Sequence, residues 1–341
     1  MVQLTHWADL GGANTFHLPC TARFSAEVGS VEGLRAVLAF SSAEGVPLKV
    51  LGGGSNVILP NTLSSLVLRY TGNRAWWGEW VSDIERLHHV EAGADWHGLV
   101  MALASSGWWG VENLALIPGT VGAAPIQNIG AYGVELSDVV EEVHVVERAS
   151  GQYRRLAQSE CMFGYRDSIF KQALSEQVVI VRVVLRLSSR PTPKLAYQGL
   201  DALAGLEVLT PLMVAERVCA LRRAKLPDPA EIGNAGSYFK NPVVPLALAK
   251  HLRASHQTLP TYPVAEPGFI KLAAGWLIDQ CGFKGARDPS GVGVHEHQAL
   301  VIVNEGHGRA EDILALETRI REAVQTRFDV TLEREPGFWG E

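Results

Sequence analysis

The chain of 341 residues is longer than one hydrophobic core normally supports, so two or three domains are expected. Its composition, 47% hydrophobic and 19% charged, is that of a globular protein and excludes a largely disordered chain. The 36 acidic residues outnumber the 30 basic ones, giving a net charge of -6, and no basic tract suggests a nucleic-acid surface.

The first expected unit is a small α/β arrangement around a glycine triplet. Apolar residues at helical spacing predict a helix over Val31–Glu44, and Gly45 ends it. Short strands are predicted over Lys49–Leu51 and Val57–Leu59. The turn between them consists of Gly52, Gly53, Gly54, Ser55 and Asn56. Successive small residues can turn their N–H groups toward a phosphate, although a generic turn is the alternative. Neither a Gly-x-Gly-x-x-Gly nor a Walker motif is present.

A second unit is expected from about Leu66 to Leu187. It contains a predicted helix near Trp96–Ser105 and predicted strands over Val139–Val146 and Tyr153–Leu156, joined by a hairpin turn. Between helix and strands, Ile117–Gly133 is too apolar for a solvated loop and too rich in glycine for a helix or strand. Buried irregular backbone needs partners for its polar groups. A large flat cofactor could supply them; a tightly packed crossover between domains is the alternative.

The third unit is expected to follow a proline-bearing loop over Ser188–Thr210. A helix is predicted over Leu212–Leu226, stopped by the prolines that follow it. Further helices are predicted over Ala273–Cys281 and Glu311–Val324 among mixed strands. The pattern as a whole predicts an α+β fold of three lobes.

The segment Gly233–Pro242 places one hydroxyl, Ser237, between glycine-loosened turns and next to Lys240 and Asn241. Glycine permits close approaches that a β-carbon would block, so the serine could contact a ligand directly. A surface turn before a strand is the plainer interpretation of an isolated match. The two other glycine-rich segments and a terminal Glu-x-Glu favour chemistry at Ser237.

The remaining reactive residues indicate neither a metal site nor a disulfide framework. Cys20, Cys161, Cys219 and Cys281 lie far apart and form no Cys-x-x-Cys pair, which is typical of reduced thiols in a cytosolic protein. His295 and His297 invite a metal interpretation, but no third ligand is suggested by spacing. Without an apolar signal sequence or membrane span, a soluble cytoplasmic protein is expected.

All three glycine-rich segments resemble those of the UDP-N-acetylenolpyruvoylglucosamine reductase family. Three further stretches support the resemblance: Phe163–Phe170, Lys225–Pro229 and Ala273–Gln280. The similarity covers nearly the whole chain in the family's order and corresponds to the longer form of the enzyme. It implies an FAD- and NADPH-dependent reductase of a UDP-sugar enolpyruvyl ether, acting in peptidoglycan synthesis. It also implies a monomer with no nucleic-acid or membrane partner and no metal.

The resemblance implies an α+β fold in which a two-lobed FAD-binding domain of the vanillyl-alcohol-oxidase type precedes an α+β substrate-binding domain. The expected ranges are 1–65 for the first FAD lobe, 66–210 for the second and 211–325 for the substrate domain, with 326–341 returning to the first lobe. FAD would be bound non-covalently. The residues implied for it are Gly52, Gly53, Gly54, Ser55, Asn56, Pro118, Gly119, Thr120, Gly122, Ala123, Gln127, Asn128, Gly130, Ala131, Tyr132 and Gly133.

By their places in the family's motifs, three residues are implied to be catalytic. Ser237 would donate a proton to the enolate-like carbon. Arg166 would hold the substrate carboxylate with its planar guanidinium, although a structural ion pair is the alternative. Glu335 matches the third position, with Glu333 as the runner-up. Here Pro336 follows where the family commonly has valine, and proline biases Glu335 toward an extended conformation.

The resemblance also implies contacts with the UDP-sugar. Tyr197 lies in the loop found in the longer form and could act as a lid over the diphosphate. The complete set of expected substrate contacts is Tyr165, Tyr197, Lys225, Asn241, Lys284 and Gln298. Each alone would be an ordinary surface residue.

Two other functions remain open from the residues. One is a flavin oxidase of the same fold, but such enzymes often tether flavin through histidine or cysteine. Neither residue occurs in the two flavin segments. The other is a non-catalytic binder of flavin or a sugar nucleotide, against which the retained Ser237, Arg166 and terminal glutamate argue.

Overall fold

The computed structural model describes residues 3–340 and divides the chain into two compact units. Unit 1 contains the chain up to Ala8, together with Ala22–Gly54 and Ser64–Ala224. Unit 2 contains Asp9–Thr21, Ser55–Leu63 and the chain from Lys225 onward. Each unit is therefore built from segments that are distant in the sequence.

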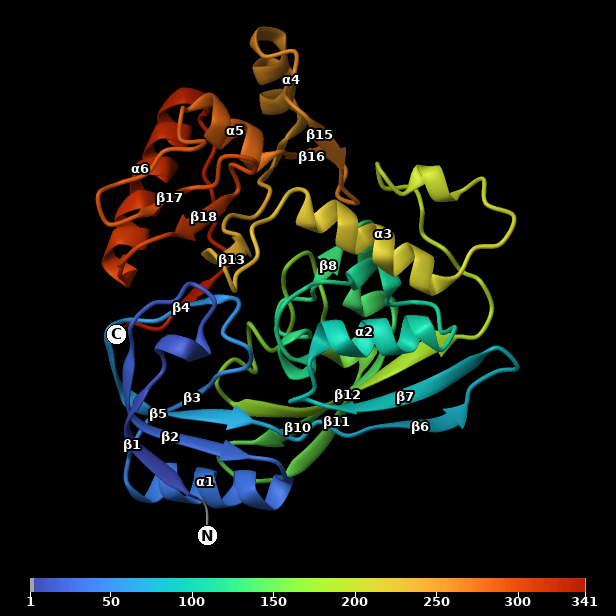
Figure 1. Ribbon diagram of the computed structural model, residues 1–341, viewed down its shortest axis with the longest axis vertical. Helices are drawn as coiled ribbons and strands as arrows, with labels where there is room; N and C mark the ends of the chain where they lie inside the picture. The colour runs from blue at the N-terminus through green and yellow to red at the C-terminus, as the bar shows by residue number, and fades with distance from the viewer. Residues whose placement is uncertain (1–2, 341) are drawn as a thin grey trace. The chain divides into compact units, whose positions relative to one another are not determined.

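The first sheet of unit 1 has four strands in the order β1-β2-β5-β3, and β3 runs parallel to β5. These strands are β1 (Leu4–Asp9), β2 (Thr21–Val28), β3 (Leu48–Val50) and β5 (Thr62–Tyr70). Helix α1 (Val31–Ala43) lies along this sheet (Figure 1). It begins where Ser30 Oγ accepts a hydrogen bond from the N–H of Gly33, at 3.1 Å. Its buried Leu34, Val37 and Leu38 share a core with strand residues of the sheet.

The second sheet of unit 1 has five strands in the order β11-β10-β12-β7-β6, and all neighbouring pairs are antiparallel. Its strands are β6 (Ala75–Trp80), β7 (Glu85–Glu91), β10 (Val140–Glu147), β11 (Tyr153–Ala157) and β12 (Val178–Ser188). The central strand β12 pairs Val183 with Val143 of β10 and with Val90 of β7. Buried residues on one face of this sheet form one side of the larger core of unit 1.

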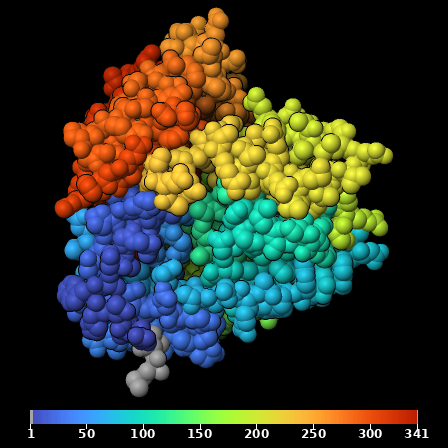
Figure 2. All heavy atoms as spheres, in the orientation of Figure 1, coloured from blue at the N-terminus to red at the C-terminus, as the bar shows by residue number. Residues whose placement is uncertain are grey.

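Helices α2 (Trp96–Ser105) and α3 (Pro211–Arg223) complete that core. Asp95 caps α2 by accepting from the N–H of Gly98 at 2.6 Å, and Thr210 caps α3 with Pro211 in its first turn. The side chains of the two helices pack directly against each other, α3 in yellow on α2 in teal (Figure 2). The 3-10 turn η2 (Glu112–Leu114) contacts both helices. The short strands β8 (Gly130–Ala131) and β9 (Val134–Glu135) contact η2 in turn.

Unit 2 has its own core, formed between short sheets and helices. Its sheets have the strand orders β13-β18-β17, β14-β16-β15 and β19-β4. The strands are β4 (Val57–Ile58), β13 (Gly233–Ser237), β14 (Val243–Pro245), β15 (Thr261–Pro263), β16 (Phe269–Leu272), β17 (Val292–Val294), β18 (Val301–Asn304) and β19 (Gly337–Phe338). The helices are α4 (Leu246–Ser255), α5 (Ala274–Gln280) and α6 (Ala310–Phe328), and α6 contributes most of the helical core residues.

The helices expected from sequence periodicity are confirmed, with ends that differ by no more than a few residues. The hairpin expected after Val139 is also confirmed, because β10 pairs with β11 around Gly151. Across residues 3–340, no helix is both long enough and apolar enough to cross a membrane.

Candidate active site

The two glycine segments of unit 1 touch each other through positions that have no side chain. A β-carbon on Gly53 would lie 2.8 Å from the Cα of Gly119, and one on Gly52 would lie 2.8 Å from Oγ1 of Thr120. The Gly119 carbonyl accepts from the N–H of Trp96 at 3.0 Å, so the start of α2 holds the second segment in place. Any larger residue at position 52 or 53 would push the two segments apart.

The second segment is fixed by a buried asparagine rather than by regular structure. Asn128 is buried and has a φ of 46°, in the left-handed region that non-glycine residues rarely adopt. Its Nδ2 donates to Glu135 Oε2 at 2.9 Å and to the Gly164 carbonyl at 3.1 Å, while its Oδ1 accepts from the N–H of Ser137 at 2.9 Å. Through these hydrogen bonds, Asn128 joins this segment to the loop that carries Arg166.

Arg166 is attached directly to the second glycine segment. Its Nη2 donates to the Gly130 carbonyl at 2.8 Å, and its guanidinium carbon lies 5.3 Å from the centre of the Tyr165 ring. The residue sits in a tight turn closed by Gly164 and Asp167, with a φ of 55°. Such backbone strain persists only where the surrounding contacts enforce it, and it is concentrated at functional sites. The turn presents one arginine beside the segment expected to hold flavin.

A second arginine, Arg222, lies in the same neighbourhood and was missed by the sequence analysis. Burial lowers the pKa of its guanidinium, and nearby Arg166 lowers it further, whereas Tyr132 and Cys219 raise it. Its Nε is buried without a hydrogen-bond partner. Within the described part of the chain, no carboxylate is among the groups that act on its charge. Arg222 is partly buried, and a desolvated cation without an acidic partner is costly, so the site is suited to an anion or a strong acceptor.

The spacing of α3 could have revealed Arg222. It follows Val218 by four residues and Cys219 by three, and both of these are buried on the inward face of the helix. A basic residue on the apolar face of a predicted helix is the signal that should have been noted.

Tyr197 lies within reach of the second glycine segment. Its ring centre is 4.8 Å from that of Tyr132 in an edge-to-face arrangement, and the side chain is 45% exposed. Unit 1 thus brings together Arg166, Tyr132, Tyr197 and both glycine segments.

In unit 2, Ser237 and Glu335 lie on neighbouring stretches of chain. Ser237 ends β13 opposite Val301 of β18. The N–H of Glu335 donates to the carbonyl of Tyr238 at 2.9 Å, and the N–H of Lys240 donates to the carbonyl of Glu333 at 2.9 Å. The Glu333 side chain is ion-paired with Lys240. Within unit 2, the N–H of Gly337 donates to the carbonyl of Asn56 at 3.0 Å.

Three of the expected nucleotide contacts gather around α5. Asn241 Oδ1 accepts from the N–H of Ala274 at 2.9 Å, and Lys284 Nζ lies 3.7 Å from Asp279 Oδ2. Gln298 Oε1 lies close beside Gly275, where a β-carbon would approach it to 3.0 Å. Another of these expected contacts, Lys225, is exposed just beyond α3.

The two histidines considered as metal ligands, His295 and His297, have ring centres 5.5 Å apart. Over the range 3–340, no three His, Cys, Asp or Glu side chains converge as a metal site would require.

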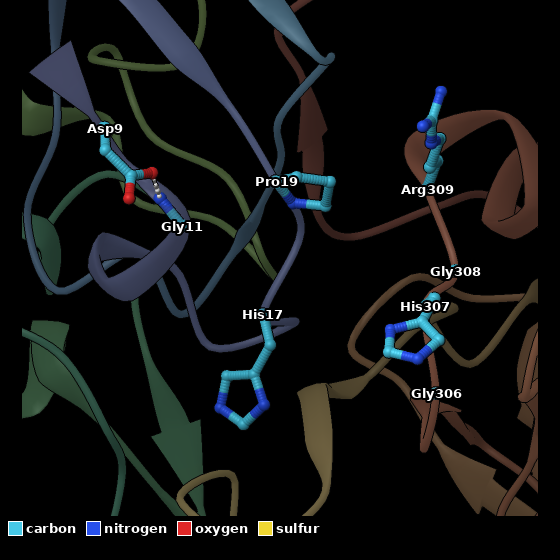
Figure 3. Close-up of a pocket in the computed structure, with 8 residues that line it drawn as sticks. All are labelled: Asp9, Gly11, His17, Pro19, Gly306, His307, Gly308 and Arg309. Carbon is cyan, nitrogen blue, oxygen red and sulfur yellow. Dashed lines mark hydrogen bonds between the residues drawn. The ribbon is translucent and has the colours of Figure 1, made fainter.

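Unit 2 contains a pocket of about 410 Å³, and none of its lining residues is a predicted site residue. It is lined by Asp9, Gly11, His17, Pro19, Gly306, His307, Gly308 and Arg309. Figure 3 shows the Arg309 guanidinium directed away from His307, with His17 on a separate segment. Because these polar groups do not converge, the pocket does not form a second site.

Comparison with known proteins defines the class and then the family. Residues 22–157 match a family model described as an FAD binding domain, so the chain carries such a domain and FAD is its cofactor. Residues 228–339 match the model of the UDP-N-acetylenolpyruvoylglucosamine reductase C-terminal domain. An FAD-binding domain followed by this C-terminal domain defines a flavoprotein oxidoreductase.

The chain belongs to the UDP-N-acetylenolpyruvoylglucosamine reductase family. It is 45% identical over 333 residues to the reductase of that name from Ralstonia nicotianae, covering 96% of both chains. It is 45% identical over 346 residues to that from Pseudomonas aeruginosa, covering 99% of both. A solved structure of the reductase from Thermus caldophilus matches with a TM-score of 0.68 at 26% identity, covering 100% of this chain and 99% of that one. The expected family and fold class are confirmed.

Proposed function

We propose that this protein reduces UDP-N-acetylglucosamine enolpyruvate to UDP-N-acetylmuramate in peptidoglycan synthesis, with NADPH as co-substrate. The observation that carries this proposal is the match to reductases of that name along 96% of the chain, including both domains. The proposal includes a monomer in the cytoplasm. The free, mostly buried cysteines support the reducing compartment.

The residues of unit 1 fit FAD. The close contact of Gly53 with Gly119 supports a narrow backbone cradle, and the unpartnered Nε of Arg222 beside Tyr132 offers a donor to an anionic or carbonyl group. Neither glycine segment contains histidine or cysteine, which supports non-covalent binding. When bound, FAD would supply hydride transfer from NADPH to the terminal carbon of the enolpyruvyl group. The residues proposed to bind FAD are the sixteen that the family resemblance implies. The proposed FAD domain has two lobes: residues 1–65 together with 326–341, and residues 66–210.

Three side chains would then complete the reduction. We assign to Ser237 the proton delivered to the carbon next to the one that receives hydride. Arg166 would bind the substrate carboxylate and spread the negative charge that develops on it. Glu335 would hydrogen-bond at the same centre or relay the proton. Glu333, the runner-up for this role, forms an ion pair with Lys240.

The nucleotide would be bound by the expected substrate domain, residues 211–325, of which α3 packs in unit 1, together with the Tyr197 loop. Lys225 and Lys284 would provide charge for the diphosphate, and Asn241 and Gln298 would provide hydrogen bonds. Tyr165 and Tyr197, both partly exposed, would also contact the substrate. Local cations serve this purpose despite the net charge of -6.

The test separates the two half-reactions. The yellow protein is reduced anaerobically with NADPH, and its absorbance is followed after the UDP-enolpyruvyl sugar is added. We expect rapid flavin reoxidation by this compound and none by UDP-N-acetylglucosamine, which lacks the enolpyruvyl group. Reduced flavin that is indifferent to the enolpyruvyl compound would overturn the proposed function.

A further inference from the structure

The side chain of Asn234 closes the turn that leads into Ser237. It lies in β13 and is buried, with 4% exposure. Its Oδ1 accepts a hydrogen bond from the N–H of Gly236 at 2.9 Å. Its Nδ2 donates to the Ile232 carbonyl at 2.8 Å and to the Pro227 carbonyl at 3.3 Å. Because an N–H only donates and a carbonyl only accepts, these partners decide which way the amide faces.

We propose that Asn234 is a positioning residue that holds this turn and thereby fixes the face of the sheet on which Ser237 lies. This inference rests on the proposed function of Ser237 as the proton donor. Asn234 itself contacts neither the substrate nor the flavin in this proposal; it acts through the backbone of Gly236.

The turn inserts one extra residue into β13. Asn234 pairs with Val303 of β18. Ser237, three positions further along β13, pairs with Val301, which is only two positions from Val303 on the partner strand. Since side chains alternate between the two faces of a strand, an uninterrupted β13 would place Asn234 and Ser237 on opposite faces. The extra residue is a β-bulge that places both on the same face.

The core of unit 2 occupies the opposite face at this point. Tyr238, which follows Ser237, and Ile302, which follows Val301, are both buried in that core. Ser237 itself is half-buried on the other face. The end of the bulge is therefore anchored by the buried Tyr238 ring, and its beginning is anchored by Asn234.

Between these two anchors, Gly236 is the flexible residue. Its φ is 68°, in the left-handed region, and glycine can leave this conformation more easily than any other residue can. The hydrogen bond from its N–H to Asn234 selects one conformation, as asparagine side chains commonly do for the residue two positions on. Asn234 is itself fixed, because its N–H donates to the Thr15 carbonyl at 2.8 Å and its carbonyl accepts from Thr15 Oγ1 at 2.6 Å.

The experiment compares Asn234→Ala and Asn234→Ser with a matched control, Asp288→Ala. Asp288 Oδ1 accepts from the N–H of Ser290, also two positions on and also at 2.9 Å, in another turn of unit 2. For each variant, the flavin is reduced with NADPH, and its reoxidation by the UDP-enolpyruvyl sugar is then followed per bound flavin.

We expect reoxidation to slow about tenfold in Asn234→Ala, the equivalent of about one hydrogen bond. The serine variant should be slowed less, since its hydroxyl can accept the same bond more weakly. Reduction by NADPH should keep its wild-type rate in both variants, and Asp288→Ala should keep both rates. Equal slowing of the two half-reactions would overturn the proposal, and so would a serine variant no faster than the alanine variant.

A double-mutant cycle tests whether Asn234 acts through Ser237. In a Ser237→Ala background, Asn234→Ala should slow reoxidation little further, because the group that it positions is already gone. Fully multiplicative effects would contradict the proposal.

A further measurement does not depend on turnover. Hydrogen exchange of the Gly236 amide, followed by NMR, should be at least severalfold faster in folded Asn234→Ala than in wild type. The Tyr238 amide, which donates to the Leu300 carbonyl at 2.8 Å, should keep its protection and serves as the internal control. Unchanged exchange at Gly236 would overturn the proposal even if the protein proved to reduce some other compound. Faster exchange at Gly236, in a protein whose wild-type form is not reoxidised by the UDP-sugar, would support the hold on the turn and count against the proposed function.

Discussion

The hydroxyl of Tyr238 donates a hydrogen bond to Oε2 of Glu317 at 2.7 Å. Arg334 donates to the same carboxylate oxygen at 2.9 Å. Tyr238 directly follows Ser237, and Arg334 directly precedes Glu335. One buried carboxylate on α6, 5% exposed, thus connects the chain stretches that carry both proposed catalytic residues of unit 2. Burial raises the pKa of the Tyr238 hydroxyl, so it stays protonated and keeps donating.

Tyr238→Phe removes the hydrogen bond to Glu317 but keeps the packing of the ring. The positions of Ser237 and Glu335 should then be less tightly fixed relative to each other. Losing one hydrogen bond to a charged group should lower the free energy of unfolding by about 1.5–3 kcal/mol. We expect kcat with the UDP-enolpyruvyl sugar to fall severalfold, while NADPH reduces the flavin at its normal rate. Urea unfolding and rapid-mixing kinetics measure the two effects. A drop in stability with unaltered kcat would mean that the network is purely structural.

Ser237→Ala removes the proposed proton donor. General acid catalysis typically contributes a factor of about 10²–10⁴ to the rate, so we expect turnover to slow by about 10²-fold or more. Flavin reduction by NADPH requires no proton from Ser237 and should stay intact. Stopped-flow absorbance separates the two steps, and similar slowing of both would remove Ser237 from its role.

Arg166→Lys replaces a planar fork by a single ammonium. A lysine cannot bind a carboxylate through two parallel hydrogen bonds, and the Nη2 bond to the Gly130 carbonyl would be lost. The second half-reaction should slow about tenfold or more, a loss of about 1.4 kcal/mol. Arg154→Lys, in a half-exposed pair with Glu147, is the matched control. If both variants behave like wild type, Arg166 does not bind the substrate.

Gly53→Ala tests the contact between the glycine segments. The new methyl would lie 2.8 Å from the Cα of Gly119, which is backbone and cannot move aside. We expect folded protein with less bound FAD, measured as the ratio of flavin to protein absorbance after purification. Gly205→Ala is the control, since nothing lies within 4 Å of its β-carbon. Full flavin content in Gly53→Ala would show that this close approach does not shape the cradle.

The lowered pKa of His88 leads us to expect that the free energy of unfolding falls in acid. Burial lowers the pKa of this histidine to about 4, with smaller effects of His89 and Arg86. Its Nδ1 is buried without a partner, and its ring lies 4.2 Å from that of Trp77. Since the folded state disfavours the protonated form, the stabilisation is complete above about pH 6.5 and is lost as the pH falls toward 4.

The expected loss through His88 is about 3 kcal/mol over that interval. His88→Phe should reduce the difference in unfolding free energy between pH 7 and pH 4.5, measured with urea at each pH. The same difference in the variant as in wild type would assign the acid sensitivity to other groups.

The sequence by itself determined the helices, the glycine segments and the family. Helix α1 is readable because its apolar residues repeat every three to four positions and its cap, Ser30, is adjacent in the chain. By contrast, the tryptophan-rich strand β6 was not predicted, since its exposed edge position gives no alternation of buried and exposed residues.

Only the tertiary structure decided which distant residues act together. Tyr238 meets Glu317 across 79 residues, and Asn113 meets Lys194 across 81. The Nε of Arg222 becomes buried without a hydrogen-bond partner only when α3 packs inward. Helical periodicity and helix caps depend on residues only a few positions apart, so the sequence alone is enough to predict them. Hydrogen bonds across 80 residues depend on how the whole chain closes, because any buried donor could in principle meet many acceptors until packing selects one.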